Sequence, residues 1–222
     1  MRRFAKILLL LVVLLLAAGG ALYVWGTKLV VQSHRYEPLI VEAANRYHID
    51  PNLIRAVIWR ESDFQPDVTG LAQERGLMQV TPDAGKEWAK AEKFATFRET
   101  DLFDPRTNIF AGSWYLARAI NRWASADEPA AFALAEYNAG RTHARRWASN
   151  LQRWEAAPFI DNIDYPTTKA YIQDILEKRD SYKTNPDSPS VYRALRNEIA
   201  AHIWRWRQAM SVKKRPVSPQ GS

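Results

Sequence analysis

The chain has 222 residues, of which 47% are apolar, and a formal net charge of +7. This length and composition suffice for one globular domain with a sizeable core. Cysteine is absent, which excludes disulfides, thiol catalysis, thiolate metal sites and a lipid anchor on cysteine.

The charge is unevenly distributed along the chain. Residues 1–37 have a net charge of +4, residues 38–190 have −3, and residues 191–222 have +6. Because the middle of the chain is slightly acidic, we expect no nucleic-acid partner despite the basic total.

The N-terminal segment contains twenty consecutive uncharged residues, 7–26. As a helix this segment would extend about 30 Å, the thickness of a bilayer's hydrocarbon core. Arg2, Arg3 and Lys6 precede it, so the positive-inside rule leaves residues 1–6 in the cytoplasm. The segment therefore predicts a single transmembrane signal anchor in the inner membrane, with the rest of the chain in the periplasm. A signal peptide cleaved within the small residues 17–21 is the alternative.

The middle of the chain predicts helices joined by short loops. Asp50-Pro51, Thr81-Pro82 and Asp104-Pro105 are typical helix starts, with a capping side chain followed by proline. Apolar spacing and such starts predict helices over residues 39–47, 51–61, 82–93, 105–123, 129–138, 141–149 and 166–182. Long β-branched alternation is absent, so we expect a mainly α fold with at most a small hairpin in residues 65–79.

The C-terminal part differs in composition from the middle. Residues 184–190 contain two prolines and small polar residues, which is typical of a linker. Residues 191–222 predict a basic helix followed, after Met210, by a disordered tail. This basic part is either a solvated extension or a contact to anionic lipids or the polyanionic cell wall.

Glu61 is placed unusually in the helix over residues 51–61. At ~100° per residue, it falls in the centre of the stripe formed by Leu53, Ile54, Val57 and Ile58. Burial raises the pKa of a carboxyl group, and a carboxyl that stays protonated near neutral pH suits a general acid. The alternative is a Glu that bends out to solvent or pairs with a nearby arginine.

Four short segments follow one another in a recognisable order: Glu61-Ser62, Gly76-Leu77-Met78-Gln79, Tyr137-Asn138-Ala139-Gly140, and Tyr171 in the last helix. Together they resemble the catalytic domain of the family 1, Slt-type lytic transglycosylases, which are related to goose-type lysozyme. The resemblance covers about residues 36–183. It implies a lysozyme-like domain that acts on peptidoglycan without cofactors.

The resemblance also implies a role for each matching residue. Glu61 would protonate the glycosidic oxygen between N-acetylmuramic acid and N-acetylglucosamine, and would then accept the proton of the muramyl C6 hydroxyl as it closes on C1. The product would carry a 1,6-anhydromuramyl end. The residues expected to bind or position the glycan are Ser62, Met78, Gln79, Tyr137, Asn138 and Tyr171.

The chain departs from the usual family pattern at three places. Residues 70–74 read Gly-Leu-Ala-Gln-Glu, where many relatives have Ser-Pro-x-Gly-Ala. Thr167 stands where many relatives have an acidic residue, and Glu136 stands where a small residue is common. Glu136 either faces solvent or adds a second carboxyl near the substrate.

Two other functions remain open at this point. A muramidase of the same fold would add water in place of the C6 hydroxyl, and a scaffold protein would bind the wall without catalysis. The four histidines show no ligand spacing, so we expect no catalytic metal.

Overall fold

A computed structural model describes residues 2–184 of the chain. The chain forms two compact units, of which the first contains residues 2–26 among those described and the second contains residues 27–184. The long helix α1 (Arg2–Arg35) begins in the first unit and ends in the second. In the part of the chain that the structure describes, no helix combines the length and the apolar character needed to cross a membrane.

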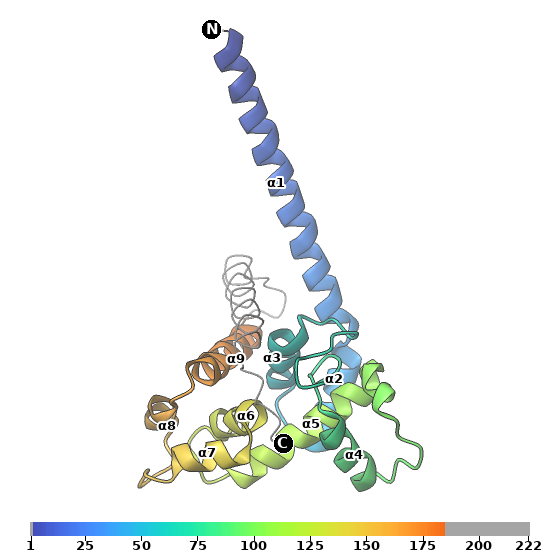
Figure 1. The fold of residues 1–222 in the computed structure, drawn as a ribbon, viewed down its shortest axis with the longest axis vertical. Coiled ribbons are helices and arrows are strands. Elements are labelled where there is room, and N and C mark those ends of the chain that lie inside the picture. Colours follow the sequence, from blue (N-terminus) through green and yellow to red (C-terminus); the bar gives the residue numbers. More distant parts are fainter. Residues whose placement is uncertain (1, 185–222) are drawn as a thin grey trace, which may run out of the picture. The chain divides into compact units, whose positions relative to one another are not determined.

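The second unit is a bundle of helices with few other elements (Figure 1). Its elements are α2 (Glu37–Tyr47), α3 (Pro51–Ser62), α4 (Pro82–Ala91), the 3-10 helix η1 (Glu99–Phe103), α5 (Pro105–Arg122), α6 (Pro129–Ala139), α7 (Arg141–Ala148), α8 (Ala156–Asn162) and α9 (Pro166–Thr184). Between residues 2 and 184 there is no strand, only two isolated β-bridges that pair Arg75 with Thr69 and with Val80. The expectation of a mainly α fold is confirmed, and the small hairpin is reduced to these bridges.

The predicted helix starts are confirmed in atomic detail. The side chains of Asp50, Thr81 and Asp104 accept hydrogen bonds from backbone amides in the first turns of α3, α4 and α5. In each case proline occupies the first helical position, where its missing N–H costs nothing. Sequence reasoning missed η1 and α8, which are too short to show an apolar period.

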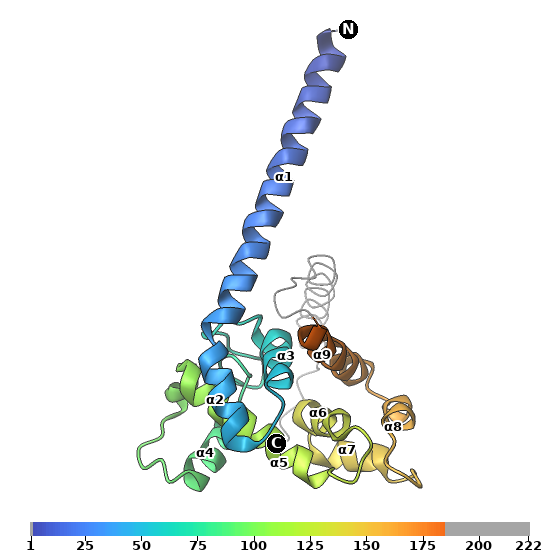
Figure 2. The same cartoon turned by 180° about the vertical axis from the view of Figure 1, so that it is seen from behind.

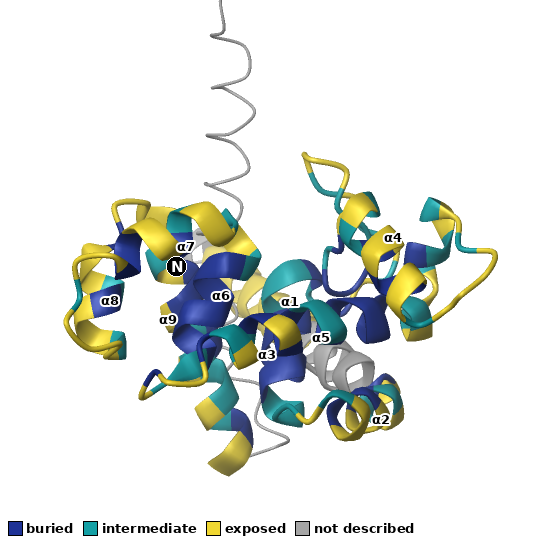
Figure 3. Ribbon diagram, turned by 90° about the horizontal axis from the view of Figure 1, so that it is seen from below, coloured by how far each residue is buried: buried dark blue, intermediate teal, exposed yellow. Residues whose placement is uncertain are grey.

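Helix α6 forms the centre of the bundle. All residues from 130 to 136 are buried, and the helix packs against α5, α7, α8 and α9 (Figure 3). A helix that is apolar on nearly every side is expected to be enclosed by others. Because α6 is fixed on several sides, it can hold the two polar residues at its C-terminal end, Tyr137 and Asn138, in defined positions.

Helices α3 and α9 pack side by side although more than a hundred residues separate them in the sequence (Figure 1 and Figure 2). The apolar stripe predicted on α3 is confirmed, because Leu53, Ile54, Val57 and Ile58 are all buried. The pairing brings the C-terminal turn of α3, which carries Glu61, against α9, which carries Tyr171.

The predicted linker and basic tail lie outside the described residues, apart from Thr184, which ends α9.

Candidate active site

Glu61 lies in the last turn of α3 and is half-buried. Its Oε1 accepts a hydrogen bond of 2.6 Å from the hydroxyl of Tyr171 on α9. The helix ends just beyond it, because Asp63 and Phe64 both adopt left-handed backbone conformations, with φ of 51° and 60°. This sharp end turns the chain away and leaves part of Glu61 open to solvent.

Burial is the largest influence on the Glu61 carboxyl and raises its pKa to about 7. The hydrogen bond from Tyr171 and the charge of Arg60 lower the pKa, whereas the charge of Glu74 raises it. A carboxyl with a pKa near 7 is populated in both protonation states at neutral pH. It can therefore act as an acid in one step and as a base in the next.

Tyr171 keeps its proton and acts as a fixed hydrogen-bond donor. The residue is buried, and burial together with the neighbouring Glu61 raises the pKa of its hydroxyl well above the ordinary value. Arg60 lies with its guanidinium 5.6 Å from the centre of the Tyr171 ring, and its Nε is 3.4 Å from Oδ2 of Asp174. The Arg60 guanidinium thus packs over the Tyr171 ring and is itself close to Asp174.

The segment before the third predicted helix is a tight loop that carries Gly76-Leu77-Met78-Gln79. Gly76 has φ of 75°, and a Cβ atom there would lie 2.4 Å from both Asn108 Nδ2 and the Leu102 carbonyl oxygen. Only glycine fits this backbone position without displacing its neighbours. The loop is closed by two hydrogen bonds between the backbones of Arg75 and Val80.

Asn108 on α5 is the side chain that fixes this loop, and the sequence analysis did not identify it. It is fully buried, its Oδ1 accepts from the Met78 amide at 2.7 Å, and its Nδ2 donates to the carbonyl oxygens of Arg75 and Leu102. A sequence signal was available, because Asn108 precedes Gly112 and Leu116 by one and two helical periods. It is thus a polar residue on an apolar stripe, the same kind of signal that identified Glu61.

Two further hydrogen bonds connect the loop to the helices around Glu61. Ser62 donates to the Leu77 carbonyl oxygen at 2.7 Å and to the Ile58 carbonyl oxygen at 3.2 Å. The Tyr137 hydroxyl donates to the Met78 carbonyl oxygen at 2.8 Å. Burial and the charge of Glu61 raise the pKa of Tyr137 well above the ordinary tyrosine value. The structure therefore brings Glu61, Ser62, Tyr137, Tyr171 and the loop into one connected group.

The side chain of Met78 is part of the core. Met78 is fully buried, and Gly112 on α5 faces it, since a Cβ there would be 2.7 Å from the Met78 sulfur. Met78 is among the residues expected to bind or position the glycan, but its side chain instead fills a hole left by the small residues of α5. Met78 acts through its backbone, which Asn108 and Tyr137 both bind.

The side chains of Gln79 and Asn138 form hydrogen bonds, but not to Glu61 or Tyr171. The Gln79 side chain donates to the carbonyl oxygens of Val68 and Gly76, at 3.1 and 2.9 Å. Asn138 is exposed, and its Oδ1 accepts from the Thr168 hydroxyl at 2.7 Å. Gln79 thus keeps a free side-chain oxygen, and Asn138 keeps its amide NH₂ group.

Thr167 and Glu136 are the two departures from the family pattern that lie in α9 and α6. Thr167 is exposed, so no carboxyl stands at the start of α9 beside Thr168. Glu136 is 2% exposed and does not face solvent; it pairs with Arg122 and accepts a hydrogen bond of 3.1 Å from Trp123 Nε1. Its carboxylate is therefore held by Arg122 and Trp123 at the end of α5.

Among residues 2–184, no group of three or more His, Asp or Glu side chains is placed to hold a metal ion. The group around Glu61 offers a carboxyl with a raised pKa, hydroxyl donors and a rigid loop. Such an arrangement suits acid–base chemistry on a polar, uncharged substrate bond.

Comparison with known proteins agrees with this arrangement. The family described as Transglycosylase SLT domain matches residues 38–160, which include Glu61, the loop and Tyr137. The chain belongs to this family. The SLT family match ends before α9, so Tyr171 lies outside the matched residues.

Individual relatives of this SLT-domain chain carry the same kind of name. The chain is 35% identical to Membrane-bound lytic murein transglycosylase F of Desulfosudis oleivorans over 151 residues. The aligned region covers 62% of this chain and 31% of that protein. Its fold is similar to the 70 kDa soluble lytic transglycosylase of Escherichia coli, with TM-score 0.62, 26% identity, and coverage of 70% of this chain and 25% of that one. An inactive Glu-to-Gln variant of Slt from Pseudomonas aeruginosa gives TM-score 0.61 and 25% identity over 68% of this chain and 25% of that chain. The chain spans about a third or less of the length of these relatives.

Proposed function

We propose that the chain is a lytic transglycosylase that cleaves the β-1,4 bond between N-acetylmuramic acid and N-acetylglucosamine in peptidoglycan and leaves a 1,6-anhydromuramyl end. The observation that carries the proposal is the Glu61 carboxyl, with a pKa of about 7 and a hydrogen bond from Tyr171. Membership of the SLT family and the names of the relatives support the substrate.

Glu61 performs both proton transfers in this mechanism. Its Oε1 is occupied by the Tyr171 hydroxyl, which leaves Oε2 to carry the proton that is transferred. In the first step this proton passes to the glycosidic oxygen as the bond to the muramyl C1 breaks. In the second step the carboxylate accepts the proton of the muramyl C6 hydroxyl as that oxygen bonds to C1, which restores the starting protonation state.

The neighbouring residues position the glycan and the acid. Ser62 and Tyr137 hold the loop of Gly76 to Gln79 against the end of α3. We assign glycan hydrogen bonds to the free Oε1 of Gln79 and the free amide of Asn138, because each side chain has its other polar atom already bonded. Met78 contributes its backbone and fills the core.

A hydrolytic muramidase is the competing function, and one observation favours it. The charge of Glu74 reaches Glu61 and raises its pKa, so a second carboxylate is close to the acid. Ordinary glycosidases use such a pair. Against this, Oε2 of Glu74 accepts a 2.9 Å bond from the Ala72 amide, which ties the carboxylate into its own loop.

The products released from purified sacculi distinguish the two functions. We expect mass spectrometry to find disaccharides with anhydro ends, each lighter than the hydrolysed product by one water. Glu74→Gln is the informative variant: a transglycosylase keeps its anhydro products when this carboxylate is removed. Ordinary reducing ends from the wild-type chain would refute the proposal in favour of a muramidase.

We also propose that residues 7–26 attach the chain to the inner membrane and that the catalytic domain lies in the periplasm. The supporting facts are the twenty uncharged residues, the exposed apolar side chains between residues 7 and 16, and the membrane-bound relative. The full chain should remain in the membrane fraction after a high-salt or alkaline wash and be released by detergent. Release by alkali alone, or a mature N-terminus near Ala21, would contradict the anchor.

Contact of residues 191–222 with anionic lipid or the wall stays a prediction.

A further inference from the structure

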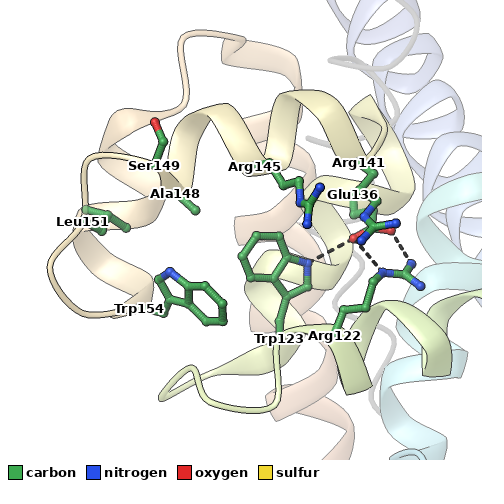
Figure 4. Close-up of a pocket in the computed structure, with 9 residues that line it drawn as sticks. All are labelled: Arg122, Trp123, Glu136, Arg141, Arg145, Ala148, Ser149, Leu151 and Trp154. Carbon is green, nitrogen blue, oxygen red and sulfur yellow. Dashed lines mark hydrogen bonds and ion pairs between the residues drawn. The ribbon is translucent and has the colours of Figure 1, made fainter.

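A second site of a different character adjoins the C-terminal end of α6 at Glu136. Here the end of α5, the helix α7 and the segment after α7 line an open pocket of about 430 Å³, and Glu61 is not part of it (Figure 4). This volume is within the range of sites that bind small molecules. The side chains that give it its chemistry are Arg122, Trp123, Glu136, Arg141, Arg145 and Trp154.

The pocket has an excess of positive charge. Glu136 is buried at its inner end and is held by Arg122 and by Trp123 Nε1, so one arginine and the one carboxylate neutralise each other. Arg141 and Arg145 are exposed, and among the residues drawn in Figure 4 neither of them makes an ion pair or hydrogen bond. Two guanidinium groups therefore remain available to a ligand, and guanidinium groups bind carboxylates and phosphates in bidentate fashion.

The wall beside these arginines is apolar and aromatic. Trp154 is 37% exposed and packs edge-on against Trp123 with ring centroids 5.0 Å apart, and Ala148 and Leu151 complete this side. A free phosphate has no group to place on such a wall. A peptide has methyl and methylene groups next to its carboxylates, which suits a pocket with guanidinium groups on one side and a tryptophan face on the other.

The position of the pocket relates it to the proposed substrate. Glu136 in the pocket and Tyr137 beside Glu61 are consecutive on α6, so their Cα atoms are ~3.8 Å apart and their side chains diverge by ~100° around the helix. Stem peptides branch from the muramic acid residues of peptidoglycan and carry free carboxylates. A stem of four residues extends up to ~13 Å, which is enough to pass from one side of a helix to another.

We propose that this pocket binds a free carboxylate of a peptidoglycan stem peptide through Arg141 and Arg145, with Trp154 as the apolar wall. The stem peptide would thereby orient the strand on which Glu61 acts. The link to catalysis rests on the proposed transglycosylase function, whereas peptide binding itself does not.

The test uses the full chain in detergent and two synthetic tetrapeptides of stem composition, one with free carboxylates and one fully amidated. In calorimetric titrations, Arg145→Gln should weaken binding of the free-carboxylate peptide by roughly threefold to tenfold, because it removes a partly exposed charge-assisted contact. Arg118→Gln is the matched control, since it removes one exposed arginine from α5 outside the pocket. It should leave the affinity unchanged.

Several outcomes would overturn the proposal. They are equal affinity for the two peptides, equal loss in Arg145→Gln and Arg118→Gln, and complete displacement of the peptide by millimolar inorganic phosphate, which would identify a phosphate site. A kinetic measurement links the pocket to catalysis: Arg145→Gln should raise the KM for peptide-bearing strands relative to peptide-free strands by a similar factor. If the wild-type chain cleaves neither strand, the transglycosylase function fails, and the titrations still decide the peptide site.

Discussion

Replacing Glu61 by glutamine is expected to lower kcat on peptidoglycan by ~10²–10⁴-fold, the usual contribution of general acid–base catalysis. Glutamine has the size of glutamate and keeps an oxygen that can accept the Tyr171 hydroxyl. It lacks the proton that must be given to the glycosidic oxygen and taken back from the C6 hydroxyl. Release of soluble fragments from sacculi gives the rate, and Glu87→Gln, an exposed glutamate on α4, is the matched control. Unchanged turnover in Glu61→Gln would refute the assigned role. An inactive Glu-to-Gln variant is known for the Slt relative of Pseudomonas aeruginosa.

The same variant should be folded, and the difference in stability between it and the wild type should change with pH in a defined direction. The pKa of Glu61 rises from its ordinary value of 4.5 to about 7 in the folded chain, so the folded state binds this proton more tightly than the unfolded state. The wild-type chain therefore loses stability as the pH increases from about 4.5 to about 7, and Glu61→Gln does not. Thermal melts should show the variant gaining on the wild type over this interval and keeping a constant advantage above it. A gap that is independent of pH would contradict the raised pKa.

The second large effect is expected for Asn108→Ala, which should lower the free energy of unfolding by about 3–5 kcal/mol. Asn108 is fully buried, and alanine would leave the Met78 amide and two carbonyl oxygens without their partners. Denaturant titration measures the loss. Asn121→Ala, an exposed residue on the same helix, is the control and should lie within about 0.5 kcal/mol of the wild type. An Asn108→Ala chain as stable as the control would show that the loop is held by other contacts.

Local rules were sufficient for most of the helices and for Glu61. A capping side chain followed by proline defined three helix starts, because that signal depends only on neighbouring residues. The phase of Glu61 on α3 predicted a carboxyl on the face that enters the core, and the structure shows it half-buried. Its hydrogen bond from Tyr171 could not be derived from spacing, since 110 residues separate the two. That partner came from the family resemblance.

The features that were missed depend on how distant segments pack. The Met78 side chain is buried because Gly112, a small residue on α5, leaves room for it. The burial of Glu136 required a basic partner, Arg122, one element earlier in the chain. Neither contact follows from a repeating pattern in the sequence, because each joins two different elements. Each forms only when α5 packs against the loop or against α6.

In the proposed reaction Glu61 directs the muramyl C6 hydroxyl, and not water, onto C1. The most direct measurement is digestion of sacculi by the full chain in ¹⁸O-enriched water, followed by mass spectrometry of the released ends. We expect anhydromuramyl products that contain no ¹⁸O at the cleaved position, and loss of these products in Glu61→Gln. One ¹⁸O atom at C1 for each bond cleaved would contradict it, because only hydrolysis takes that oxygen from the solvent.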